Sequence, residues 1–179
     1  ILTDFGFGST TQSNLPGELP GILRPLKTWS ATDLTRVPIG QAVAVTPLQV
    51  TRAFCALANG GDLVTPRIEA LGANETPAGR VRVLSPAVAA HTRDVLHRAI
   101  LEGTGQKANS KLYALFGKTG TAQLPDFKLG GYAPDQYVSS FVAGAPVEAP
   151  RLVIGCFIHK PNKKIGHYGG TVAAPPVMK

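Results

Sequence analysis

The sequence has few cysteines and no long apolar run. Its two cysteines, Cys55 and Cys156, both stand among apolar residues, so we expect them to be packing side chains. A disulfide between them is the alternative, because sequence spacing does not report the Cα separation that a disulfide requires. The longest apolar run, residues 152–158 with one glycine in it, is far below the roughly 20 residues that span a bilayer. We therefore expect no membrane-spanning helix or signal segment within these residues.

Acidic residues are scarce relative to basic ones. Lys and Arg number 18, Asp and Glu number 11, and the net charge is +7. This excess favours an anionic partner such as nucleic acid, a lipid headgroup surface or a substrate that carries a carboxylate. The basic residues are scattered, however, and the one tight group, residues 162–164, is typical of a solvated turn. No aromatic residues alternate with it, so we do not expect nucleic-acid binding.

The length of 179 residues, 44% of them hydrophobic, suits one domain or a piece of one. The sequence begins at Ile1 and ends just after the apolar stretch "TVAAPPVM", so we interpret both ends as cleavage or truncation boundaries. The first 40 residues are rich in Gly, Pro, Ser and Thr and are expected to be mostly irregular.

Two helices are predicted by their end signals. Residues 46–61 begin with Thr-Pro and end with Gly-Gly, and residues 85–103 begin with Ser-Pro after a short strand at 80–84. In the second helix apolar residues recur at helical spacing: Val88, Val95, Leu96, Ala99 and Ile100. His91 and His97 lie six positions apart on this helix and so point to different faces. No metal site is predicted there.

The pattern after residue 108 changes to extended segments. Residues 116–123, 137–145 and 151–159 are predicted strands, and the short link "PVEAP" predicts that the last two pair antiparallel. The first two are separated by residues 124–136, which is longer than a hairpin needs. We interpret this connection as a functional loop.

The stretch "FGKTGTAQ" contains Gly-Lys-Thr, which also occurs in phosphate-binding loops. Such a loop needs a glycine five positions before the Gly-Lys pair, and that position is Leu112 here. As a strand, the stretch places Lys118 and Gly120 on one face and Thr119 and Thr121 on the other. A glycine inside a strand indicates close approach of another group, hydroxyls can bind a carboxylate, and a backbone N–H beside a lysine can stabilise an oxyanion.

Four segments together resemble the penicillin-binding transpeptidase family, especially the class B enzymes of cell division and elongation. They occur in the family's order and cover nearly the whole chain: "GFGSTTQSNLPGE", "IGQAVAVTPLQVTRAFCALANGG", "GKTGTAQ" and "HYGGTVAAPPV". The resemblance implies a partial α/β (α+β) transpeptidase fold like that of serine β-lactamases, with an antiparallel sheet flanked by helices.

The family carries three motifs, and only Lys-Thr-Gly is present. No serine here is followed by Lys three positions later or by Asn two positions later, so Ser-x-x-Lys and Ser-x-Asn are absent. By the family's order, both are expected before Ile1. The resemblance therefore implies that residues 1–179 are the C-terminal portion of a single transpeptidase domain, without the nucleophile. The isolated chain is expected to be inactive.

The resemblance also implies roles for the Lys-Thr-Gly segment. Lys118 and Thr121 are the expected catalytic residues: Lys118 in the catalytic hydrogen-bond network, and the Thr121 N–H as half of the oxyanion hole. Thr119, Gly120 and Thr121 are the expected substrate-binding residues. The expected ligands are the D-Ala-D-Ala stem peptide of peptidoglycan and β-lactams. No cofactor or metal is expected.

Rival functions remain open from sequence alone. A D-Ala-D-Ala carboxypeptidase or a β-lactamase would share the Lys-Thr-Gly wall, and a noncatalytic scaffold module would lack the serine altogether. Complete relatives imply membrane anchoring that faces the periplasm, partners in cell-wall synthesis, and a further strand beside residues 151–159. Without that strand, whether from the missing part of the domain or a second chain, we expect an open apolar edge and self-association.

Overall fold

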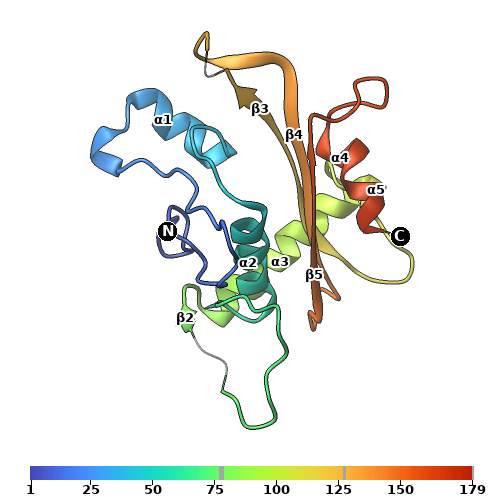
Figure 1. Cartoon of the computed structure of the whole chain (residues 1–179). Helices are drawn as coiled ribbons and strands as arrows, with labels where there is room; N and C mark the ends of the chain where they lie inside the picture. The colour runs from blue at the N-terminus through green and yellow to red at the C-terminus, as the bar shows by residue number, and fades with distance from the viewer. Residues whose placement is uncertain (77–78, 127, 179) are drawn as a thin grey trace.

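The computed structural model describes residues 1–76, 79–126 and 128–178, and its centre is an antiparallel sheet of order β3-β4-β5. The strands are β3 (Phe116–Pro125), β4 (Tyr132–Ala145) and β5 (Leu152–His159). Helix α2 (Pro47–Ala58) lies on one side of the sheet, whereas α4 (Gly169–Val172) and α5 (Ala174–Val177) lie on the other (Figure 1). The predicted architecture, an antiparallel sheet flanked by helices, is confirmed.

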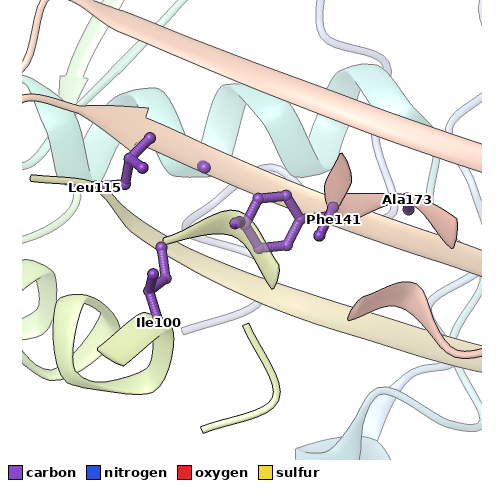
Figure 2. Packing of buried hydrophobic residues seen from close by; sticks show 7 residues of the cluster. Ile100, Leu115, Phe141 and Ala173 are labelled. Carbon is purple, nitrogen blue, oxygen red and sulfur yellow. The ribbon is translucent and has the colours of Figure 1, made fainter. Parts of the chain in front are cut away.

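The main core lies between the sheet and the C-terminal helices. Residues that pair directly across the strands share one face of a sheet, so the row Thr119, Phe141 and Cys156 faces α4 and α5. Phe141 is fully buried, and Figure 2 shows its ring among Ile100, Leu115 and Ala173. Cys156 packs against this cluster. The strand that carries the Lys-Thr-Gly segment is therefore anchored from the side of its threonines.

Helix α2 begins where the sequence predicts. The Thr46 hydroxyl accepts from the Gln49 backbone N–H at 3.2 Å, and the Gln49 side chain accepts from the Thr46 N–H at 2.9 Å. Gln49 is 1% exposed, and its Nε2 donates to the carbonyls of Ser9 at 2.7 Å and Pro20 at 2.9 Å. The buried side-chain amide of Gln49 thus caps the first turn of α2 and also holds the irregular N-terminal segment against this helix.

Helix α3 (Pro86–Leu101) also begins at its predicted cap, since the Ser85 hydroxyl accepts from the Val88 N–H. Only some of the apolar residues predicted to lie on one face of this helix are buried. Ile100 is 1% exposed, but Val88 and Val95 remain 50% and 53% exposed. Periodicity predicted a packed face that includes Val88 and Val95, whereas the buried residues of this helix are Ala89 near its start and Ile100 near its end.

The first 40 residues are mostly irregular, as predicted, but they contain a helix that the sequence analysis missed. This is α1 (Ala31–Arg36), whose first turn is closed by a capping box between Ser30 and Asp33. The Ser30 N–H and hydroxyl, together with Arg24, hold the pKa of Asp33 below its ordinary value. Short 3-10 helices flank it at Leu26–Thr28 and Val37–Ile39.

A second, smaller sheet contains the strand that the sequence predicts at 80–84. Strand β2 (Arg80–Arg82) is shorter than predicted and pairs antiparallel with β1 (Asp62–Val64). Buried Asp62 forms ion pairs with both Arg80 and Arg82. Two cations on one buried carboxylate fix the short pair of strands.

The predicted long loop at 124–136 is wrong for most of its length. Strand β3 continues to Pro125 and β4 begins at Tyr132, and these two residues face each other across the ladder. Residue 127 lies outside the described residues. The Asp126 carboxylate accepts from the backbone N–H groups of Lys128 and Leu129 at 2.9 and 3.0 Å, which lowers the pKa of Asp126. Strand pairing therefore overrides the weak strand propensity of this polar stretch.

Strand β5 lies at the edge of the sheet. Among residues 1–76, 79–126 and 128–178, no strand pairs with its outer side. Leu152 is 57% exposed and Ile154 is 39% exposed on this strand. The expected open apolar edge is therefore present, and what borders it in the whole protein remains a prediction.

Candidate active site

The Lys-Thr-Gly segment is extended, as predicted, and borders a groove of about 340 Å³. The groove is lined by threonines, by glycine backbone and by one lysine: Thr104, Lys107, Thr119, Thr121, Gly169, Gly170 and Thr171 are among its residues. A larger cavity of about 810 Å³ lies around residues 12–14 and 65–69. That cavity contains none of the predicted site residues. We therefore assign the candidate site to the smaller groove, because of its lining residues and not its volume.

Thr121 is held by the turn that follows β5. Its Oγ1 accepts a hydrogen bond from the Gly169 N–H at 3.0 Å. The hydroxyl of Ser139, its partner across the ladder, donates to the carbonyl of His167. Because Gly169 supplies the proton of the first bond, the Thr121 hydroxyl proton stays available to a ligand in the groove.

Thr119 is tied to the loop after α3. Its Oγ1 lies 2.6 Å from Oγ1 of Thr104, and either hydroxyl can be the donor. The two predicted carboxylate-binding hydroxyls, on Thr119 and Thr121, thus lie on one face of β3, and each has one fixed neighbour. Their shared face follows from strand alternation, whereas their neighbours come from distant parts of the chain.

Two glycines let the turn approach the strand. A Cβ on Gly169 would collide with the backbone carbonyls of Gly120 and Ser140, and one on Gly170 would collide with the carbonyl of Thr104. Only glycine fits where backbone packs directly on backbone. Gly169 therefore sets the position from which its N–H reaches Thr121.

Aromatic rings support the same turn. The ring of His167 stacks on Tyr137 with centroids 4.2 Å apart, and the ring of Tyr168 is tilted against it at 4.4 Å. Tyr168 lines the groove and is 64% exposed. These contacts add to the hydrogen bonds that fix residues 167–169 against the strand.

Lys118 and Gly120 occupy the other face of β3. Lys118 is exposed, and its Nζ donates to the Thr119 carbonyl at 3.0 Å. A Cβ on Gly120 would collide with the hydroxyl of Ser140, so this glycine allows close packing of β3 on β4. Gly120 is not among the residues that line the groove, and its role in substrate binding remains a prediction.

Several groove residues were missed from sequence. Thr104 and Lys107 lie in "EGTGQKA", which indicated only a flexible connection, and Thr171 follows the Gly-Gly pair. They join β3 through tertiary contacts alone. The one available signal was the glycine pair, whose backbone permits an approach closer than any side chain allows.

No metal or membrane element is found in the described part of the chain. Residues 1–76, 79–126 and 128–178 contain no group of three or more His, Cys, Asp or Glu side chains arranged to hold a metal ion. None of the helices described there has the length and apolar character to cross a bilayer. Cys55 and Cys156 are free, half-buried thiols, and burial raises the pKa of both.

The sequence model of the penicillin binding protein transpeptidase domain matches residues 1–179. This chain belongs to that transpeptidase family. The transpeptidase chain is 37% identical to Stage V sporulation protein D of Bacillus subtilis over 185 residues. It is 31% identical to the probable peptidoglycan D,D-transpeptidase PenA of Neisseria gonorrhoeae over 178 residues. In both comparisons the alignment covers 98% of this chain, and it covers 28% and 29% of the two relatives.

The transpeptidase fold agrees with a solved structure from this family. Penicillin binding protein 3 of Mycobacterium tuberculosis, crystallised with ampicillin, superposes with a TM-score of 0.86 at 33% identity. The superposition covers 99% of this chain and 42% of that one. The transpeptidase chain thus spans less than half the length of these relatives, and the resemblance of its four segments to the class B enzymes is confirmed.

Proposed function

We propose that this chain forms the Lys-Thr-Gly wall of a serine-type peptidoglycan D,D-transpeptidase that β-lactams acylate. The observation that carries the proposal is the Thr119–Thr121 pair, which lines an open groove with one hydroxyl fixed by the Gly169 N–H. Its relative in Neisseria gonorrhoeae bears the name of this activity, and a structural neighbour holds a β-lactam.

In the proposed reaction, a serine from outside these 179 residues attacks the carbonyl carbon of the D-Ala-D-Ala bond. Its proton passes to a base, the C–N bond breaks, and the terminal D-alanine leaves with a proton on its amine. The acyl-enzyme is then attacked by an amine of a second stem peptide, which restores the serine hydroxyl. No oxidant, metal or cofactor enters this balance.

This chain would supply positive charge and hydrogen-bond donors to that reaction. Thr119 and Thr121 would bind the terminal carboxylate through their hydroxyls, and the Thr121 N–H would donate to the developing oxyanion. Lys118, on the other face of β3, would join the proton network of the serine. It is exposed in this structure and, among the described residues, bonds one neighbouring carbonyl, which leaves two of its ammonium protons for such partners.

The proposed setting is the periplasmic side of the cytoplasmic membrane, because peptidoglycan is assembled there. An anchor would belong to a part of the protein outside these residues. Partners in cell-wall synthesis follow from the same proposal. A carboxypeptidase would differ only by admitting water instead of the amine, and no contact within the described groove favours it.

The test is covalent labelling with a fluorescent penicillin. The full-length protein that contains this chain is expected to be labelled, with loss of signal after pretreatment with unlabelled penicillin, whereas residues 1–179 alone are expected to stay unlabelled. D-alanine release from a D-Ala-D-Ala peptide, measured with and without an amine acceptor, separates transpeptidase from carboxypeptidase. An unlabelled full-length protein would indicate the scaffold alternative, and rapid hydrolysis of the penicillin would indicate a β-lactamase.

A further inference from the structure

Lys107 brings a positive charge to the groove from a third part of the chain. It lies in the 3-10 helix Gln106–Ala108, between α3 and β3, and lines the groove together with Thr119 and Thr121. Its Nζ lies 3.5 Å from the hydroxyl of Thr171, which also lines the groove. The lysine side chain therefore contacts the segment that follows Gly169 and Gly170.

The backbone beneath Lys107 is fixed. Ala108 is fully buried in the core cluster beside Phe141, and its N–H donates to the Gly105 carbonyl at 2.8 Å. The exposed lysine thus projects from an anchored turn rather than from a free loop. Its ammonium can be placed reproducibly beside the groove hydroxyls.

The charge of Lys107 is not balanced by a neighbouring carboxylate. Within the part of the chain that the structure describes, none of the ion pairs includes this residue. Its one hydrogen bond, to Thr171, is at the limit of normal length and neutral. The other polar side chains that line the groove are neutral, namely the hydroxyls of the threonines and of Tyr168 and the amide of Gln106, so the groove presents one cation and several neutral donors. This arrangement fits a monovalent anion such as a carboxylate.

Lys118 cannot supply this charge from the same side. Strand alternation places it on the opposite face of β3, and its Nζ bonds the Thr119 carbonyl. We propose that Lys107 binds the substrate carboxylate that Thr119 and Thr121 hold, and so makes the groove selective for ligands with a free acid. The inference rests on the proposed function and identifies a binding residue that the Lys-Thr-Gly motif does not include.

The test compares two ligands that differ only in the carboxylate. In the full-length protein, second-order acylation rates are measured for benzylpenicillin and for its methyl ester, by competition with a fluorescent penicillin. Lys107→Ala should slow acylation by the free acid about tenfold, as expected for one lost hydrogen bond to a charged group, and should leave the ester rate unchanged. Lys107→Arg should restore most of the loss, because it keeps the charge.

Lys111→Ala is the matched control. Lys111 is an exposed lysine in the same connection, four residues further along, and it does not line the groove. It should leave both rates unchanged. Added salt should shrink the difference between wild type and Lys107→Ala, because exposed charges are screened.

The outcomes separate this inference from the proposed function. If wild type is acylated and Lys107→Ala has unchanged rates with both ligands, the inference is wrong and the proposed function stands. Equal losses on the acid and the ester would also overturn it, because they would indicate a merely structural role. If wild type is not acylated by either ligand, the proposed function fails and the inference fails with it.

Discussion

The two outer strands of the main sheet, β3 and β5, differ in the contacts that the rest of this chain makes with them. On β3, distant segments converge on Thr119 and Thr121: the loop at Thr104, Lys107 and the turn at Gly169. On β5, apolar side chains are exposed and, in the described residues, no strand pairs with the outer side. Both strands lie at an edge of the sheet. The β3 edge is organised by tertiary contacts with distant segments of this chain, whereas the β5 edge is open and carries exposed apolar side chains.

This difference indicates where each edge gets its structure. The face of β3 needs only residues of this chain to place its hydroxyls, so its geometry can be tested by single substitutions. An unpaired apolar edge such as that of β5 is a template for another strand. Its state should therefore depend on what else the protein or the solution provides.

Gly169→Ala should have the largest effect, because it disrupts the packing of the turn backbone on strands β3 and β4. The new Cβ would collide with the carbonyls of Gly120 and Ser140, so the turn must move away and its N–H must leave Thr121. A displacement of about 1 Å can cost on the order of 100-fold in rate. The measurement is β-lactam acylation of the full-length protein, with Gly72→Ala as the control, since the nearest atom to a Cβ on Gly72 is at 3.8 Å. A wild-type rate would show that the turn does not position Thr121.

Thr121→Val should have the next largest effect, because it removes one hydroxyl and keeps the backbone donor. The expected loss of transition-state stabilisation is about 1.5 to 3 kcal/mol, the range for a hydrogen bond to a charged group. Acylation rates of the full-length protein measure it. Thr92→Val is a suitable control, since the Thr92 hydroxyl donates to the Val88 carbonyl within α3 and does not line the groove. Unchanged acylation by the Thr121 variant would argue that this hydroxyl does not touch the carboxylate.

The open edge should reveal itself as self-association of residues 1–179. Light scattering after size exclusion should give a mass above that of one chain, and Ile154→Lys should lower it, because charge on an edge strand opposes pairing. Ile68→Lys, which alters a 74% exposed side chain away from the sheet, should not. A soluble monomer in the wild type would mean that the β5 edge does not recruit a strand.

The organised edge was only partly predictable from sequence. Alternation predicted β3 and the shared face of Thr119 and Thr121, and caps predicted the starts of α2 and α3. Thr104 and Gly169 meet β3 from about 15 and 50 residues away, respectively, and no local pattern encodes such contacts. The strand that carries the Lys-Thr-Gly motif could therefore be predicted from the sequence, but the residues that hold this strand in place could not.

The errors in the predicted fold have similar causes. Helix α1 was missed because its setting is rich in turn formers, although Ser30 and Asp33 form a capping-box pair that could have indicated it. The extension of β4 to Tyr132 was missed because "YAPDQ" has weak strand propensity, and cross-strand pairing decided it. Val88 and Val95 follow helical periodicity, but periodicity does not say whether a neighbour covers them.

The smallest predicted effect concerns the link between the two edges, where the loop after β5 contacts the start of β4. Lys163 Nζ lies 2.9 Å from the Asp135 carboxylate, and its hydrogen bond and charge lower the pKa of Asp135.

A carboxyl whose pKa is lower in the folded state stabilises the fold above its ordinary pKa, and that contribution is lost as the pH falls through the lowered value. Thermal melting of the full-length protein should therefore show wild type more stable than Asp135→Asn at pH 6, with the gap closing below pH 3.8, the ordinary value. Asp94→Asn provides a comparison on another exposed carboxylate, which takes part in none of the ion pairs of the described residues. A gap that widens on acidification would mean that the sign is wrong, and identical curves at every pH would mean that this pair does not hold the loop leading from the open edge to the groove.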